Sequence, residues 1–278
     1  MGFHAKNEQN AAEIQTPNLD ALVSQGIELD RHYAFAFCSP SRSALHTGRN
    51  PIHVNVLNSD LASVNLKDPV SGFAGIPRNM TAFPEKLMKA GYNTVQAGKW
   101  HIGLATPDHT PLGRGYAKNL AYLDGANDYW SSITGDWCGN GAYTDLWGSV
   151  EPAYGVNNSW TCSQKRQTGC KYEDDIFTNF TLSSISSHDP STPLMVYFAP
   201  HSVHMPLECP AQQLAKFSNI STDNPDRQLY AAMTNYVDYH IGLVVDAFKA
   251  KGLWENTLML VTADNGGPIY GGASGCGS

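Results

Sequence analysis

The sequence has no apolar run approaching the ~18–20 residues that a helix needs to span a bilayer. Its first residues, from Met1 to Lys6, lack the apolar core of a signal peptide. Basic residues are also scarce, because 18 Lys and Arg stand against 25 Asp and Glu, for a net charge of −7. This balance argues against a general nucleic-acid-binding protein, which would carry a basic stripe. We therefore expect no membrane span and no nucleic-acid partner.

Charged residues make up only 15% of the chain and apolar residues 42%, which is not the profile of a disordered protein. At roughly 100–200 residues per domain, 278 residues allow one large domain or two ordinary ones. A chain of this length buries enough surface to form a core without disulfides or metals.

The six cysteines include no C-x-x-C pair, which argues against a zinc ribbon. Three of them, Cys138, Cys162 and Cys170, fall in one Gly-, Ser-, Asn- and Thr-rich stretch, where a disulfide-closed loop is plausible with its pairing left open. Four N-x-Ser/Thr sequons occur, at Asn79, Asn157, Asn179 and Asn219. Together these features favour a protein of the secretory pathway, lysosomal or extracellular.

Helix and strand patterns alternate along the chain. Cap, proline and glycine signals predict helices at 17–25, 41–47 and 81–90, and apolar spacing predicts further helices at 174–187 and 226–251. Short apolar runs predict strands at 27–33, 93–97, 194–199 and 258–262, the last two buried. Residues 104–172 read as long loops or an insertion. The alternation predicts an α/β fold with a mainly parallel sheet and helices on both faces.

The first chemically informative segment runs from Cys38 to Arg49, with the sequence C-S-P-S-R-S-A-L-H-T-G-R. It places Cys38 at a predicted helix N-terminus, one turn before Arg42, and both the free helix amides and the guanidinium favour anions. A lone cysteine in this position is more often a buried structural residue. The full string resembles the signature of the type I sulfatases, in which this cysteine is oxidised to formylglycine.

The second segment is G-K-W-H-I-G, from Gly98 to Gly103. In an extended segment Lys99 and His101 point to the same side. A surface lysine beside a capping histidine would give the same pattern. The string resembles the second sulfatase signature, which implies that Lys99 binds sulfate and that His101 contacts the formylglycine hydrate.

The third segment, H-S-V-H-M-P, follows the predicted strand at 194–199. Two histidines three residues apart can bind a transition metal, but no third nitrogen or sulfur ligand is near in sequence. The segment is similar to one in arylsulfatase B-like enzymes, which implies that His204 touches the sulfate. His201 does not match that position, and we expect a structural role for it.

The fourth segment, D-N-G-G from Asp264 to Gly267, follows the predicted strand at 258–262. Ligands bind at the carboxyl ends of strands in open α/β sheets, and side-chain oxygens suit Ca²⁺ or Mg²⁺. In isolation such a string is more often a turn. It resembles the sulfatase metal motif, which implies Asp264, Asn265 and the modified Cys38 as metal ligands.

The resemblance covers nearly the whole chain and fits arylsulfatase B-type enzymes best. It implies an alkaline-phosphatase-like fold and an N-terminal catalytic domain over residues 1–278. Because the family's Asp-Asp metal pair and its lysine after D-N-G-G have no counterpart here, it also implies a fragment truncated at both ends and poorly active by itself.

The implied reaction is hydrolysis of a sulfate monoester of a sulfated sugar or an aryl alcohol. A formylglycine-generating enzyme would modify Cys38, and Ca²⁺ or Mg²⁺ would assist. Arg42, Lys99 and His204 would neutralise the sulfate, and His101 would act as the base that releases it. Two alternatives stay open: a phosphatase or phosphodiesterase of the same superfamily, and an inactive truncated relative.

Overall fold

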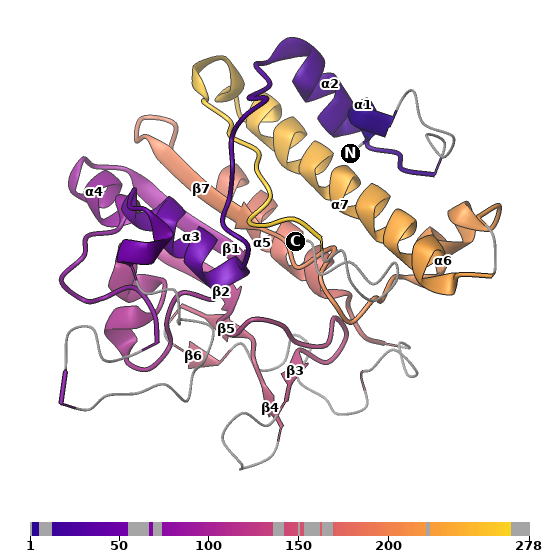
Figure 1. Cartoon of the computed structure of the whole chain (residues 1–278). Coiled ribbons are helices and arrows are strands. Elements are labelled where there is room, and N and C mark those ends of the chain that lie inside the picture. The colour runs from indigo at the N-terminus through magenta and orange to yellow at the C-terminus, as the bar shows by residue number, and fades with distance from the viewer. Residues whose placement is uncertain are drawn as a thin grey trace.

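Three parallel strands form the larger part of the main sheet in the computed structural model of the chain (Figure 1): β1 (Asn93–Lys99), β2 (Lys118–Tyr122) and β7 (Leu194–Ala199). Two short antiparallel strands, β5 (Trp147–Gly148) and β6 (Glu151–Pro152), complete the order β6-β5-β2-β1-β7. A separate ribbon pairs β3 (Ile133–Thr134) with β4 (Tyr143–Thr144). The structure describes residues 2–5, 13–54, 67–68, 74–135, 142–149, 151–152, 162, 169–220 and 223–267. The predicted mainly parallel sheet is confirmed.

Five longer helices surround the sheet: α2 (Pro17–Gln25), α3 (Cys38–Thr47), α4 (Phe83–Lys89), α5 (Glu173–Ser186) and α7 (Pro225–Ala250). Helices α5, α7 and α2 form a layer on one side of the sheet, and α3 and α4 lie on the other side (Figure 1). The short helices are α1 (Gly2–Ala5) and α6 (Ala211–Leu214), with 3-10 turns at Pro51–His53, Pro107–His109, Leu112–Arg114, Ala215–Phe217 and Trp254–Asn256. The predicted helices on both faces are confirmed.

Local signals explain where these helices begin and end. Pro17 occupies the first turn of α2, and Gly48 ends α3 in the left-handed conformation with φ of 66°. α3 begins at Cys38 with Phe37 before it, three residues earlier than the predicted start at 41, so Ser39 and Pro40 lie in its first turn. At the start of α7 the side chain of Asn224 accepts a hydrogen bond from the amide of Arg227.

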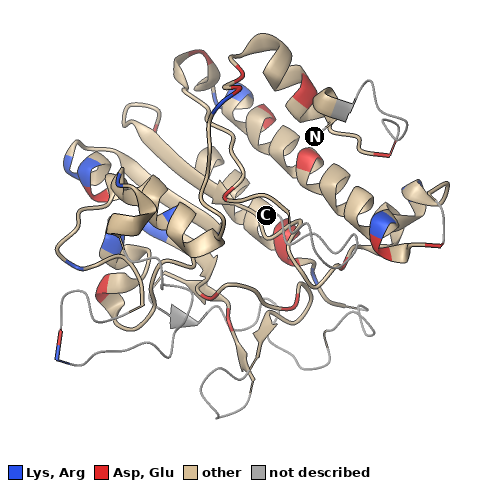
Figure 2. Cartoon of the chain, in the orientation of Figure 1, with Lys and Arg blue, Asp and Glu red and all other residues tan. Residues whose placement is uncertain are grey.

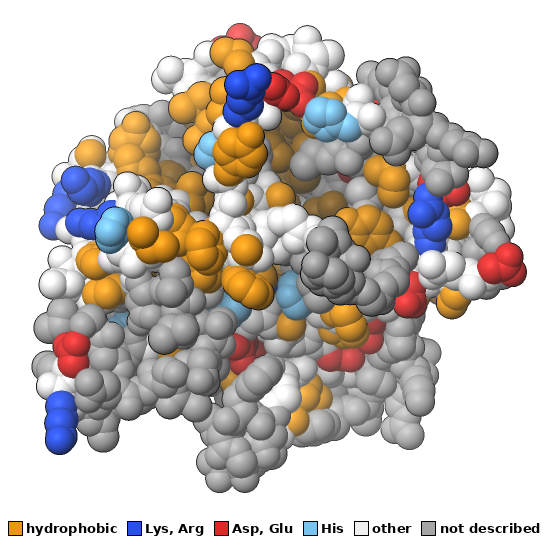
Figure 3. All heavy atoms as spheres, viewed as in Figure 1, with side chains coloured by type: hydrophobic (Ala, Val, Ile, Leu, Met, Phe, Trp, Pro, Cys, Tyr) orange, Lys and Arg blue, Asp and Glu red, His pale blue; other side chains and the backbone are white. Residues whose placement is uncertain are grey.

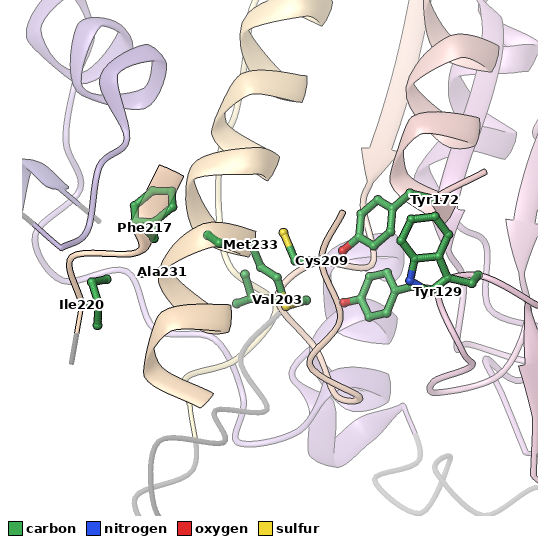
Figure 4. Close-up of a cluster of buried hydrophobic side chains, with 10 residues drawn as sticks. Tyr129, Tyr172, Val203, Cys209, Phe217, Ile220, Ala231 and Met233 are labelled. Carbon is green, nitrogen blue, oxygen red and sulfur yellow. The ribbon is translucent and has the colours of Figure 1, made fainter. Parts of the chain in front are cut away.

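The two faces of the sheet bury separate apolar clusters. On one face, Ile176 and Phe177 of α5 cluster with Ala97, Leu120, Tyr122 and Leu146. The cluster on the opposite face consists of Val54, Ile76, Trp100, Ile102, Tyr116, Ala121 and Leu123. A third cluster joins α7 to the loops beyond the strands, with Met233 of α7 on one side and the rings of Tyr129 and Tyr172 on the other (Figure 4). The loops that follow β2 and β7 are therefore anchored to the helical layer.

Two of the predicted strands do not form. Residues 27–33 and 258–262 are not in strands, and their apolar side chains are open to solvent: Ile27 is 90% exposed and Leu258 is 85% exposed. β7 forms as predicted but is only partly buried, because it is the last strand of the sheet among the described residues. Figure 3 shows that hydrophobic side chains are exposed on this face of the molecule. Both segments have the apolar spacing of strands without a partner strand to pair with.

The central strand β2 was missed by the sequence reading, which placed it in the loop-rich region 104–172. Its only signal is the short run N-L-A-Y from Asn119 to Tyr122, bounded by the exposed Lys118. Four residues are too few for a clear period of two, and Asn is depleted in strands. β2 is nonetheless a core strand, because its last four residues are buried between β1 and β5.

A disulfide joins Cys162 to Cys170, eight residues apart, within the predicted loop. Cys38 and Cys209 are free thiols, and Cys138 lies outside the described residues. The sequon residues Asn79, Asn179 and Asn219 are exposed, and Asn157 lies outside the described residues. Among the described residues, no helix is long and apolar enough to cross a membrane.

Candidate active site

The predicted site residues converge at the carboxyl ends of β1, β2 and β7. The strands are in register there, with Lys99 opposite Tyr122 and Gly98 opposite Ala199. α3 brings Cys38 and Arg42 to this edge, the loop after β7 brings His204, and the segment after α7 brings Asp264. Segments that are far apart in sequence thus meet where open α/β sheets bind ligands.

Arg42 ties the site together. Its Nε donates to Asp264 Oδ2 at 2.8 Å, and its Nη1 donates to the backbone oxygen of Lys99 at 3.0 Å. Nη1 also donates to the hydroxyl of Tyr197 at 3.3 Å. The guanidinium is 4% exposed. Burial opposes its charge, but Tyr197 and Asp264 together raise the pKa of Arg42, so it stays cationic.

Lys99 lies deeper than the sequence suggested. It is not the surface lysine that the same pattern would allow, because its exposure is 0%. Its Nζ has no hydrogen-bond partner of standard geometry, although the thiol of Cys38 lies close enough to act on its charge. Burial and the nearby Arg42 lower the pKa of Lys99, while Cys38 and Asp264 oppose that shift. An anion bound here would favour the charged lysine.

Gly98 explains how β1 approaches β7 so closely. Its φ is +98°, and a Cβ at this position would lie 1.9 Å from the backbone oxygen of Ala199. Only glycine fits such a position. The first glycine of G-K-W-H-I-G therefore serves the close contact of two strands, directly before Lys99.

His101 is held in a left-handed backbone conformation, with φ of +55°. Such a conformation is uncommon for a residue with a side chain, and it costs roughly 1–2 kcal/mol. The sequence suggested an extended segment from Lys99 to His101, but the backbone leaves the extended conformation at His101. The ring packs on Gly125, where a Cβ would lie 2.9 Å from His101 Cε1. Burial, followed by Lys99 and Arg42, lowers the pKa of His101 well below its usual value, so the imidazole is neutral.

His204 and His201 occupy different environments. His204 is partly exposed, and its Nδ1 lies 2.8 Å from the backbone oxygen of Met205. Burial and Lys99 lower the pKa of His204 to about 4. His201 is fully buried, with Nδ1 2.9 Å from Glu173 Oε2 and its ring stacked on Tyr129 at 3.9 Å between centroids. His201 is therefore held more firmly than His204.

Several residues that shape the site were missed by sequence reasoning. His46, in the third turn of α3, is fully buried between the backbone oxygen of Arg42 and the hydroxyl of Tyr116, at 2.8 and 2.9 Å. Asp174, in the first turn of α5, accepts hydrogen bonds from the amides of His201 and Ser202. That acidic first turn is red in Figure 2. Three acidic residues in a row at a helix start were the one available signal.

The residues present do not by themselves make a divalent-cation site. Ca²⁺ takes about six oxygen ligands. Among the described residues, no group of three or more His, Cys, Asp or Glu residues is placed to hold a metal ion. Asn265 is buried, and the carboxylate of the preceding residue, Asp264, accepts a hydrogen bond from Arg42. The assignment of Cys38, Asp264 and Asn265 as metal ligands stays a prediction.

Comparison with known proteins agrees with this geometry. Mouse Arylsulfatase J is 30% identical over 275 residues, covering 99% of this chain and 42% of that protein. Mouse N-acetylgalactosamine-6-sulfatase is 28% identical over 290 residues, covering 99% of this chain and 51% of that protein. The chain thus spans about half the length of the curated relatives it matches.

A solved structure has the same fold. It is the crystal structure of Ps i-CgsB in complex with k-i-k-neocarrahexaose, and it is 26% identical with a TM-score of 0.67, covering 87% of this chain and 51% of that chain. The expected alkaline-phosphatase-like architecture is thereby confirmed. The family model described as Sulfatase matches residues 3–277, so the chain belongs to the sulfatase family.

Proposed function

We propose that the protein hydrolyses sulfate monoesters of sulfated sugars at the site formed by Cys38, Arg42, Lys99, His101 and His204. The observation that carries this proposal is the pair of hydrogen bonds that Arg42 donates. They join Asp264, 222 residues away, and the backbone oxygen of Lys99 to one buried group of cationic and imidazole side chains. Such a constellation suits a tetrahedral oxyanion.

The cations account for recognition of sulfate. Arg42 and Lys99 are both buried, so a bound anion would interact with them at low dielectric, where charge interactions are strong. Asp264 compensates one of the two charges in the absence of an anion. One net positive charge therefore remains for the substrate.

Cys38 is the proposed nucleophile position. It begins α3, its side chain is partly exposed, and it lies beside Lys99. After oxidation of Cys38 to formylglycine by a formylglycine-generating enzyme, the hydrated aldehyde would carry two hydroxyls. The oxygen of one would attack the sulfur. Loss of a proton from the other would re-form the aldehyde and release sulfate. The neutral imidazole of His101 is suited to accept a proton from that second hydroxyl, and His204 is suited to contact the sulfate.

The substrate class and the location are parts of the same proposal. One relative's name specifies N-acetylgalactosamine with sulfate at position 6, and the solved relative Ps i-CgsB is in complex with an oligosaccharide, k-i-k-neocarrahexaose. The Cys162–Cys170 disulfide and the three exposed sequon asparagines support passage through the secretory pathway. We propose Ca²⁺ or Mg²⁺ as the cation of the whole protein.

The test is an assay of a chromogenic aryl sulfate and the matching aryl phosphate, with protein from a host that supplies a formylglycine-generating enzyme. We expect faster hydrolysis of the sulfate, loss of activity in Lys99→Ala, and little change in Lys118→Ala, whose side chain is exposed at the start of β2. Peptide mass spectrometry should find the aldehyde at Cys38. Preference for the phosphate ester, or an unmodified thiol in a fully active protein, would contradict the proposal.

A further inference from the structure

His201 is fixed more firmly than an ordinary core histidine. Its amide donates to Asp174 Oδ1 at 2.7 Å, its Nδ1 lies 2.9 Å from Glu173 Oε2, and its ring is stacked on Tyr129. Glu173 is oriented in turn, because Asn127 Nδ2 donates to Glu173 Oε1 at 2.8 Å. The other ring nitrogen, Nε2, is buried without a hydrogen-bond partner among the described residues. The ring is thus locked with one nitrogen unused.

The protonation of this pair decides what Nε2 can do. Burial raises the pKa of Glu173 well above its usual value and lowers the pKa of His201 well below its own, so the buried pair carries no net charge. When Glu173 donates its proton to Nδ1, or when that proton has moved to Nδ1 within an ion pair, Nε2 carries a hydrogen and can donate it.

Two more buried donors, the Tyr122 hydroxyl and the Lys99 ammonium group, are near His201. Tyr122 is fully buried, its ring centroid is 4.7 Å from that of His201, and its hydroxyl has no partner among the described residues. Tyr122 is opposite Lys99 in the parallel register, so the two side chains lie on the same face of the sheet. Lys99 Nζ is buried there as well.

We propose that His201 and Tyr122, together with Lys99, bind an oxygen of the substrate's sulfate group. Buried donors without acceptors are rare, so a cluster of them indicates a missing acceptor. A sulfate oxygen brings only lone pairs, whereas a water molecule would bring two hydrogens of its own into a group of donors. Arg42 and Lys99 also act electrostatically on His201, which places its ring within the field of the site.

The inference rests on the proposed function and makes His201 and Tyr122 substrate-binding residues. Tyr122→Phe gives the sharpest test, because it removes one hydroxyl that has no partner in the described structure. Titration with inorganic sulfate by isothermal calorimetry should give about tenfold weaker binding or more. Stability in denaturant should stay the same or rise. Tyr116→Phe is the matched control, because its buried hydroxyl is bonded to His46 and should lower stability without changing sulfate affinity.

His201 is tested by a pair of variants. His201→Phe keeps a ring that can stack on Tyr129 but has no N–H, so sulfate binding should weaken. His201→Gln restores an N–H donor, so part of the affinity should return. A purely structural role predicts that both variants lose stability while the folded fraction binds sulfate like the wild type.

The outcomes separate the two proposals. If the wild type binds sulfate and Lys99→Ala weakens it while Tyr122→Phe and His201→Phe bind normally, this inference is wrong and the proposed function stands. If the wild type neither binds inorganic sulfate nor hydrolyses a sulfate ester, the proposed function fails and this inference fails with it.

Discussion

Asp238, in the middle of α7, accepts a hydrogen bond from the amide of Leu19 in the first turn of α2, 219 residues earlier, at 2.8 Å. Its other oxygen accepts from the amide and the side chain of Asn18, at 3.0 and 2.8 Å. The carboxylate is fully buried. One residue of α7 therefore satisfies the free amides that begin α2, and its negative charge lies at the positive end of that helix dipole.

This contact predicts that Asp238→Ala loosens the α2–α7 packing. Two backbone amides would lose a buried acceptor, so we expect a loss of about 1–3 kcal/mol in the free energy of unfolding. Urea unfolding followed by circular dichroism measures it. Asp246→Ala is the control, because that side chain is 76% exposed and its pairing with Lys249 is weak. Equal stability of the two variants would contradict the capping role.

Asp238 also shows where sequence reasoning stops. Helical spacing predicted α7 almost to the residue, but it did not identify Asp238 as a buried residue. Apolar period locates a helix but does not identify the buried polar residue that serves a distant element. In the same way, Glu173 and His201 are 28 residues apart, and no local pattern links them.

The site itself was predictable only through its motifs. The family resemblance assigned Cys38, Arg42, Lys99, His101 and His204, and the structure brings these residues together. The motif strings do not predict burial, so they could not show that Lys99 is fully buried. The strands expected at 27–33 and 258–262 did not form for a different reason. An apolar pattern shows that a segment could form a strand, but it does not show whether a neighbouring strand is there to pair with it.

Gly125 supports the ring of His101, and we predict that Gly125→Ala displaces it. The added methyl would lie 2.9 Å from His101 Cε1, closer than real contacts allow, so the ring must move. Sulfate-ester hydrolysis should fall at least tenfold while the melting temperature changes little. Gly135→Ala is the matched control, since a Cβ there has no atom within 4 Å. A crystal structure of Gly125→Ala with His101 unmoved would show that Gly125 does not set the position of the ring.

The exposed segment at 257–263 predicts self-association. Leu258 is 85% exposed and Leu260 is 78% exposed, so the double change Leu258→Ser and Leu260→Ser should leave the unfolding free energy nearly unchanged. Light scattering should show less aggregation, because unpaired apolar segments promote association. The control Val244→Ser alters a side chain 6% exposed in α7 and should destabilise the fold. Unchanged scattering in the double variant would show that other surfaces drive association.

Glu208 predicts how stability depends on pH. Its carboxyl is 3% exposed, and one oxygen accepts the amide of Tyr129 at 3.1 Å. Burial, followed by the neighbouring Asp128, raises the pKa of Glu208 to about 8. The folded state therefore keeps a proton that the unfolded chain loses above its usual pKa of 4.5, so stability falls between pH 4.5 and about 8.

Four other buried groups with shifted pKa values, Asp145, Asp174, His204 and His240, titrate below the upper part of this range. The pKa values of Asp145 and Asp174 are raised to about 6 by burial, which adds to the loss of stability only up to that pH. Burial lowers the pKa values of His204 and His240 to about 4, which makes stability rise with pH, but only up to the usual histidine value of 6.5. The interval from pH 6.5 to 8 is therefore the one in which Glu208 is best observed.

We predict that wild-type stability falls by on the order of 2 kcal/mol from pH 6.5 to pH 8, and that Glu208→Gln reduces this slope. The glutamine side chain can still accept the hydrogen bond from the backbone N–H of Tyr129, but it cannot ionise beside Asp128. Urea unfolding at several pH values measures the slope, and the difference between wild type and variant cancels the contribution of Glu173, whose pKa is also raised by burial. Glu255→Gln, at an exposed position, should keep the wild-type slope. If Glu208→Gln has the same slope of stability against pH as the wild type, the pKa of Glu208 is not raised by burial beside Asp128, and this prediction is wrong.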